Sequence, residues 1–78
     1  MDKENKVFSY ITNRSYDVKK CIRCGLPKLQ ALYLKHNVPL YDVYYTDDLY
    51  SGEPVVIMLF DKEKSKPLYE LWQKHELK

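Results

Sequence analysis

The feature that most constrains this chain is the apolar run Val55-Val56-Ile57-Met58-Leu59-Phe60, in which both alternating sets of side chains are apolar. A strand with two apolar faces is typical of the centre of a sheet. A loop of turn-forming residues, Asp47 to Pro54, precedes the run. Before that loop, the alternation of Leu40 to Thr46 predicts a half-buried strand, with a core face of Tyr41, Val43 and Tyr45 and an accessible Tyr44 on the other.

The sequence also predicts a helix before these strands. It should run from Pro27 to about His36, because proline suits the first turn of a helix. Asn37 tolerates the left-handed conformation that ends a helix, and Pro39 follows it closely. The apolar stripe of this helix is Leu29, Leu32, Tyr33 and His36.

A second helix should close the chain, with Ser65 as its N-cap and Pro67 in its first turn. Its i, i+3, i+4, i+7 stripe is Leu68, Leu71, Trp72 and His75. We expect Trp72 to be a principal core residue, and we expect both histidines to be partly buried rather than catalytic.

The N-terminal part predicts extended structure. Val7 to Ile11 indicates a strand, Thr12 to Ser15 a turn, and Tyr16 to Cys24 fits both helical and strand spacing, of which we favour strand. We therefore predict a single α+β domain over residues 1–78, with the order β-(β)-α-β-β-α and both helices on one face of a small sheet.

Charge is unevenly distributed although the net charge is only +2. Residues 1–39 hold eight Lys and Arg against three Asp and Glu, which is +5, and residues 40–78 hold five against eight, which is −3. A solvated face is the favoured interpretation of the basic half, and nucleic-acid binding by it is an alternative. The candidate basic patch is Lys19, Lys20, Arg23 and Lys28.

The start of the chain, Met1 to Lys6, has no apolar segment, and the longest apolar run has six residues where a membrane helix needs about 20. We expect a cytoplasmic protein with reduced thiols and no membrane partner.

Cys21-Ile-Arg-Cys24 is the one chemically suggestive motif, since paired thiols chelate metals or exchange disulfides. A structural zinc site needs four ligands, and His36 and His75 do not form a compact second pair. We therefore expect no metal and no cofactor, and we favour unreactive thiols over redox chemistry.

Two family resemblances extend these inferences. The chain resembles a shortened glutaredoxin in the order of its parts, which is strand, CxxC, helix, strand and then Pro54-Val55-Val56-Ile57. This resemblance implies a thiol-disulfide oxidoreductase in which Cys21 attacks, Cys24 resolves, and Pro54 is a cis-proline beside the active site.

The second resemblance covers residues 25–78. The chain resembles small domains of phages and prophages of Gram-positive bacteria in the segments Gln30 to Leu34, Leu40 to Val43, Phe60-Asp61 and Leu71-Trp72. It implies an accessory binding role without catalytic residues. The chain shows no Ser/His/Asp order, no phosphate-cradling glycine loop and no HExxH, so we expect no enzyme.

The leading hypothesis is therefore a non-enzymatic protein of a phage or mobile element that occludes a host macromolecule such as a defence nuclease. A host protein is the expected partner, and a homodimer is an alternative use of the same strand. Tyrosines and acids gather where such an interface would lie, and its candidate residues are Tyr41, Tyr44, Asp47, Asp48, Tyr50 and Glu53.

Overall fold

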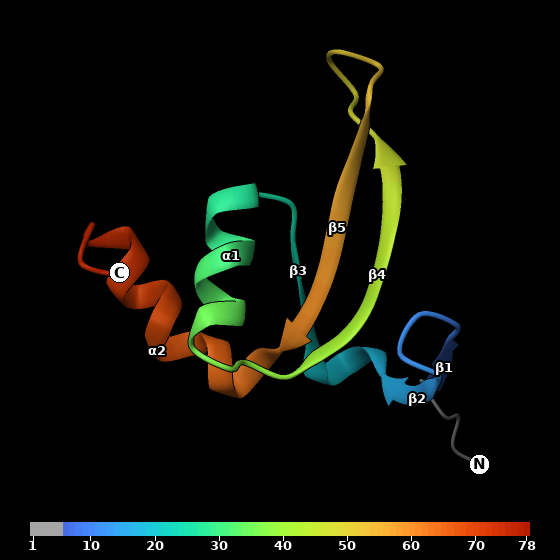
Figure 1. The fold of residues 1–78 in the computed structure, drawn as a ribbon, viewed down its shortest axis with the longest axis horizontal. Helices are drawn as coiled ribbons and strands as arrows, with labels where there is room; N and C mark the ends of the chain where they lie inside the picture. The colour runs from blue at the N-terminus through green and yellow to red at the C-terminus, as the bar shows by residue number, and fades with distance from the viewer. Residues whose placement is uncertain (1–5) are drawn as a thin grey trace.

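A computed structural model describes residues 6–78 as two helices and two small antiparallel sheets, a mixed α+β arrangement (Figure 1). Strands β1 (Lys6–Ser9) and β2 (Arg14–Asp17) form the first sheet. The 3-10 helix η1 (Val18–Lys20) connects them to β3 (Cys21–Cys24). The remaining elements are α1 (Pro27–Lys35), β4 (Leu40–Asp47), β5 (Pro54–Asp61) and α2 (Lys62–Gln73).

Strand β5 is the centre of the second sheet, as its two apolar faces predict, with β3 on one side and β4 on the other. Both pairings are antiparallel. Strand β3 pairs only with the segment Met58 to Asp61, whereas β4 follows β5 over its whole length to Pro54. The outer half of the β4–β5 hairpin is consequently a two-stranded ribbon that projects from the body (Figure 1).

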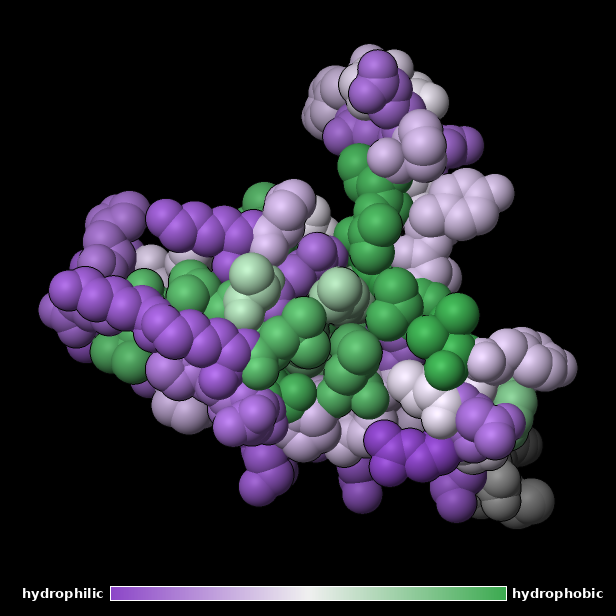
Figure 2. All heavy atoms as spheres, viewed as in Figure 1, coloured by the Kyte–Doolittle hydropathy of each residue, from purple (hydrophilic) through white to green (hydrophobic). Residues whose placement is uncertain are grey.

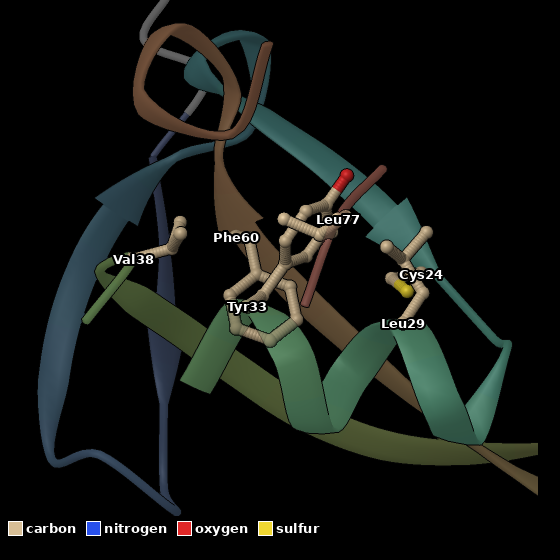
Figure 3. Close-up of a cluster of buried hydrophobic side chains, with 6 residues drawn as sticks. All are labelled: Cys24, Leu29, Tyr33, Val38, Phe60 and Leu77. Carbon is tan, nitrogen blue, oxygen red and sulfur yellow. The ribbon is translucent and has the colours of Figure 1, made fainter. Parts of the chain in front are cut away.

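The two helices contribute to one core cluster, on one face of the sheet. Tyr33 of α1 and Phe60 of β5 are both fully buried and meet edge to face at 5.0 Å between ring centroids (Figure 3). The other buried members of the cluster are Cys24, Leu29, Val38 and Leu77. The aromatic rings contribute most of this core because they bury the largest area. The hydroxyl of Tyr33 is buried there without a hydrogen-bond partner.

The β1–β2 hairpin covers part of the opposite face. Tyr16 of β2 packs with Ile57 and Leu59 of β5, and its ring stacks on Tyr41. A carboxylate holds the hairpin in place: Asp42 accepts a hydrogen bond of 2.6 Å from the Ser9 hydroxyl and one of 2.7 Å from the Tyr16 hydroxyl. The helices leave this face uncovered, as predicted, but the hairpin covers its base, and Tyr44, farther along β4, is 39% exposed.

These hydrogen bonds stabilise the charged form of Asp42. Burial opposes the charged form, but the hydrogen bonds from Ser9, from Tyr16 and from the backbone N–H of Val43 together hold the pKa of Asp42 below its usual range. Burial and the bond to Asp42 raise the pKa of Tyr16 from 10.0 to about 12. The pair therefore favours a neutral phenol donating to a carboxylate at neutral pH.

A β-bulge between Leu40 and Asp42 changes the faces of β4 that strict alternation predicts. It turns Tyr41 away from the helices and onto Tyr16, while its hydroxyl donates a hydrogen bond of 2.8 Å to Asp61. Tyr45, also expected in the core, is 71% exposed, because it lies on the ribbon beyond the reach of the helices.

The helix termini follow the sequence prediction in part. Helix α1 has proline in its first turn, and Asn37 after its end takes a left-handed φ of 61°. Helix α2 begins earlier than predicted, because Asp61 caps it by accepting a hydrogen bond of 2.9 Å from the backbone N–H of Lys64. Ser65 is instead buried inside the helix, with Pro67 after it.

The α2 stripe is less buried than its spacing predicts. Leu68 and Trp72 pack only partly buried against the core, and Leu71 and His75 are exposed. His36 is exposed as well, and its Nε2 lies 2.7 Å from the backbone oxygen of Lys78. Trp72 is therefore a secondary core residue, and the role we expected for it belongs to Tyr33 and Phe60.

Candidate functional site

The outer half of the β4–β5 hairpin, residues 44–56, is hereafter the arm. Figure 2 shows apolar surface continuing from the body onto the lower part of the arm, with hydrophilic residues around its tip. At the tip, Leu49 is 96% exposed and Tyr50 is 99% exposed. Tyr44, Tyr45 and Val56 are also exposed on the arm. Large apolar and aromatic side chains thus gather at the most projecting part of the molecule.

The tip loop has an ordered hydrogen-bond pattern. The Asp48 carboxylate accepts from the backbone N–H groups of Tyr50 at 2.7 Å and of Ser51 at 3.2 Å. The backbone N–H of Asp48 donates to the Glu53 oxygen, and its own oxygen accepts from Gly52, whose φ of 74° glycine adopts without strain. Because Asp48 satisfies the loop's own backbone, Leu49 and Tyr50 are left to point outward.

The side chain of Gln30, which sequence analysis did not single out, forms hydrogen bonds at the base of the arm. The amide nitrogen of Gln30, on α1, donates to the backbone oxygen of Cys24 at 2.7 Å and to that of Val56 at 2.9 Å. It therefore supplies a hydrogen bond to the backbone of β5 just beyond Met58, the last residue of β5 that pairs with β3. Farther along the arm, the outer edges of β4 and β5 pair with no other strand of residues 6–78. An unpaired strand edge is a template for pairing with another chain.

The predicted interface residues divide between the arm and its base. Tyr44, Asp47, Tyr50 and Glu53 lie exposed on the arm. Asp48 is half-buried and serves the loop, and Tyr41 lies at the base, engaged with Tyr16 and Asp61. Tyr45 and Leu49 join the exposed set, although the alternation placed Tyr45 in the core. Leu49 sits in a loop of turn formers, and a leucine in such a loop is the signal that could have identified it.

The predicted basic patch is also divided. Lys19 and Lys20 at the end of η1 line a cavity of about 600 Å³, together with Tyr41, Asp61, Lys62, Glu63 and Lys66. Arg23 lies beside the adjoining cavity of about 410 Å³, which Lys62 and Lys66 also line. Lys28 lies apart from both, in the first turn of α1. The structure thus adds two lysines of α2 that the sequence did not connect with η1.

The two cysteines lie on strand β3, on opposite faces of the sheet. Cys24 is buried in the cluster with the helices, and Cys21 packs beside the cluster of Tyr16. Three residues of strand span about 10 Å, beyond the Cα separation of about 7 Å that a disulfide tolerates. Burial is the main factor that raises the pKa of each thiol, and three carboxylates, Asp17, Asp61 and Asp42, raise that of Cys21 further.

This geometry departs from the expected redox arrangement. The CxxC pair does not open a helix, where a thiolate would be stabilised. Pro54 begins β5 after a trans peptide bond, so the cis-proline implied by the glutaredoxin resemblance is not present.

Residues 6–78 contain no cluster of three or more His, Cys, Asp or Glu side chains placed to hold a metal ion. No helix within the same residues combines the length and the apolar character needed to cross a membrane.

Comparison of the chain with protein-family models, with curated proteins and with solved structures found no match.

Proposed function

We propose that the chain is a protein-binding module whose contact surface is the arm. The observation that carries the proposal is the almost complete exposure of Leu49 and Tyr50 at the tip of a projecting hairpin. Exposure of large apolar side chains in one place marks interaction sites, and tyrosine combines a rigid apolar ring with a hydroxyl that hydrogen-bonds. The ordered loop reduces the conformational entropy that binding would cost.

The charge of the arm indicates the chemistry of its partner. The arm, residues 44–56, contains no lysine or arginine, whereas it contains Asp47, Asp48 and Glu53. Opposite charges around an interface speed association and discriminate against wrong partners. We therefore assign to the arm a partner protein with an apolar groove that is bordered by lysine and arginine.

Occlusion is the mechanism that follows from this shape. A narrow acidic ribbon that enters a basic groove blocks it to other anions, and the groove of a nuclease is basic because it holds phosphates. We extend the proposal to the target of the leading hypothesis, a host macromolecule such as a defence nuclease. Self-association through the unpaired edge of β4 is the alternative outcome of the test.

Site-specific photo-crosslinking in a bacterial host tests the proposal. A photoreactive phenylalanine analogue replaces Tyr50 in one variant and Tyr10 in the control, because Tyr10 is a tyrosine 89% exposed on the other hairpin. We expect discrete crosslinked products at position 50 that are absent at position 10, and mass spectrometry then identifies the crosslinked chain.

A second pair of variants measures the energetic role of the tip. Leu49→Ala with Tyr50→Ala should lower the affinity for the crosslinked partner by at least tenfold, and Tyr10→Ala should leave it unchanged. Equal crosslinking at positions 10 and 50 would refute the proposal. A crosslink to a second copy, with a dimer in sedimentation velocity that the double variant abolishes, would replace the partner protein by self-association.

A further inference from the structure

The cavity between η1 and α2 carries a chemistry opposite to that of the arm. Four lysines from two distant parts of the sequence line it: Lys19 and Lys20 end η1, and Lys62 and Lys66 stand four residues apart on α2. Residues four apart lie on the same side of a helix, so both α2 lysines are directed to one surface. The fold thus brings together lysines that the sequence separates by more than 40 residues.

The acidic residues of the cavity only partly offset these charges. One carboxylate oxygen of Asp61 accepts from the Tyr41 hydroxyl at 2.8 Å, and the other accepts from the backbone N–H of Lys64 at 2.9 Å. The backbone bond and, after it, the bond from Tyr41 keep the pKa of Asp61 low against the effect of burial. Asp61 is therefore engaged in capping α2, and Glu63 is the other acid of the lining. Four positive charges face two negative ones, a local net charge of +2.

The size of the cavity suits a small ligand. Its volume of about 600 Å³ lies within the range of roughly 300 to 1,000 Å³ that ligand sites occupy. Lysine binds phosphoryl oxygens as a point charge, with three donors on each ammonium group. Several lysines around one hollow fit several phosphoryl groups better than a single carboxylate, because each added negative charge meets another ammonium group.

The adjoining cavity extends the same surface. Lys62 and Lys66 line both hollows, and beyond them lie Arg23, Ile22 and the ring of Tyr69. This second hollow is mostly apolar apart from its cationic groups, so it has room for a flat organic group attached to the phosphates.

We propose that the η1–α2 cavity binds a ligand with two or three linked phosphoryl groups, held by Lys19, Lys20, Lys62 and Lys66. The ligand is either an inorganic polyphosphate or a nucleotide, which share this group. In the nucleotide, the base would lie against Ile22 and Tyr69 in the adjoining cavity. This site is separate from the arm and does not depend on the proposed protein partner.

Calorimetric titration of the full chain with tripolyphosphate, at low and at physiological salt, tests the proposal. Lys62→Gln with Lys66→Gln removes two charges from the cavity, and Lys28→Gln with Lys35→Gln removes two from the exposed surface of α1. Both pairs change the net charge equally, so a difference between them reports the site and not the overall field. We expect the cavity pair to lose at least tenfold in affinity and the α1 pair to change less than twofold.

A nucleoside triphosphate titrated in the same way distinguishes the two sources. Affinity at least tenfold above that of tripolyphosphate, lost on Tyr69→Ala, assigns a nucleotide, and equal affinities assign a polyphosphate; both support the site. Amide chemical-shift changes should centre on residues 19–20 and 62–66. Absence of tripolyphosphate binding at low salt, or equal losses in the two lysine pairs, would overturn the proposal, as would binding of oligonucleotides alone.

Discussion

Replacing Tyr16 with phenylalanine removes one hydroxyl from the contact that joins the β1–β2 hairpin to β4. The ring and its stacking on Tyr41 stay, whereas the hydrogen bond of 2.7 Å to Asp42 is lost. Hydrogen bonds to charged groups contribute about 1.5 to 3 kcal/mol. Asp42 is only half-buried and keeps its bonds from Ser9 and Val43, so water can replace the lost donor. We expect a loss near the lower value, about 1.5 kcal/mol.

The stability that this hydrogen-bonded pair contributes should fall at both low and high pH. Because folding lowers the pKa of Asp42, its contribution is complete above the unfolded value of about 3.9 and is lost as the pH falls through the lower folded value. Because folding raises the pKa of Tyr16 from 10.0 to about 12, its contribution is complete below pH 10 and is lost as the pH rises toward 12. The variant should lose less stability at alkaline pH than the parent protein, although Tyr33 and Tyr41, whose pKa values are also raised by folding, still contribute to that loss.

Urea denaturation at pH 7, with hydrogen exchange on the same samples, measures the effect. Exchange should accelerate most in β1 and β2, because the lost bond holds the hairpin rather than the second sheet. Tyr10→Phe is the matched control, since that tyrosine is 89% exposed. A change in unfolding free energy for Tyr16→Phe within about 0.5 kcal/mol, the range of ordinary surface substitutions, would refute the role of the Asp42 bond.

Three further substitutions test the rest of the fold. Tyr33→Phe should be neutral or stabilising by up to about 1 kcal/mol in thermal denaturation, because it removes a buried hydroxyl without a partner; a large loss would show that the hydroxyl is bonded. Gln30→Ala should cost about 1 to 3 kcal/mol, because it removes the donor to the oxygens of Cys24 and Val56, and exchange at the base of the arm should rise. Asn37→Ala should cost about 1 kcal/mol and Asn37→Gly less, since φ there is 61°; equal stabilities would contradict a left-handed residue.

Local patterns in the sequence predicted the parts of the fold that depend on local physics. Asn37 ends α1 because a short polar side chain tolerates a positive φ, which is readable from one residue and its neighbours. Strand β5 is central because its run is apolar on both faces, a property of six consecutive residues. The two helices were predicted for similar reasons, from spacing and proline placement.

The prediction failed where a long-range contact decides the structure. Asp42 looks like a solvated strand residue, but its partners Ser9 and Tyr16 lie 33 and 26 residues away. The bulge beside it turns Tyr41 to the other face, and alternation contains no sign of a bulge. Asp61 and Ser65 are both good N-cap residues, and only the direct continuation of β5 into α2 selects Asp61.

The same separation of local from long-range information applies to the two proposed sites. The arm could be predicted in part, because its exposed tyrosines and acids are contiguous in the sequence. The lysine cavity could not, because η1 and α2 are brought together by the long-range pairing of Cys21 with Asp61. Lys19 and Lys20 were identified as basic residues, but the two α2 lysines that complete the cavity lie in the acidic half of the chain.

The small net charge of +2 therefore conceals two local fields of opposite sign. Tyr41, which lines the cavity, and Asp48, at the tip, are separated by seven positions along β4 and the start of the loop, roughly 20 Å at the rise of a strand. That exceeds the Debye length of about 8 Å at physiological ionic strength, so neither field cancels the other at its own site. An acidic arm for a basic groove and a basic cavity for phosphate can thus coexist in one small domain, each weakened by salt independently.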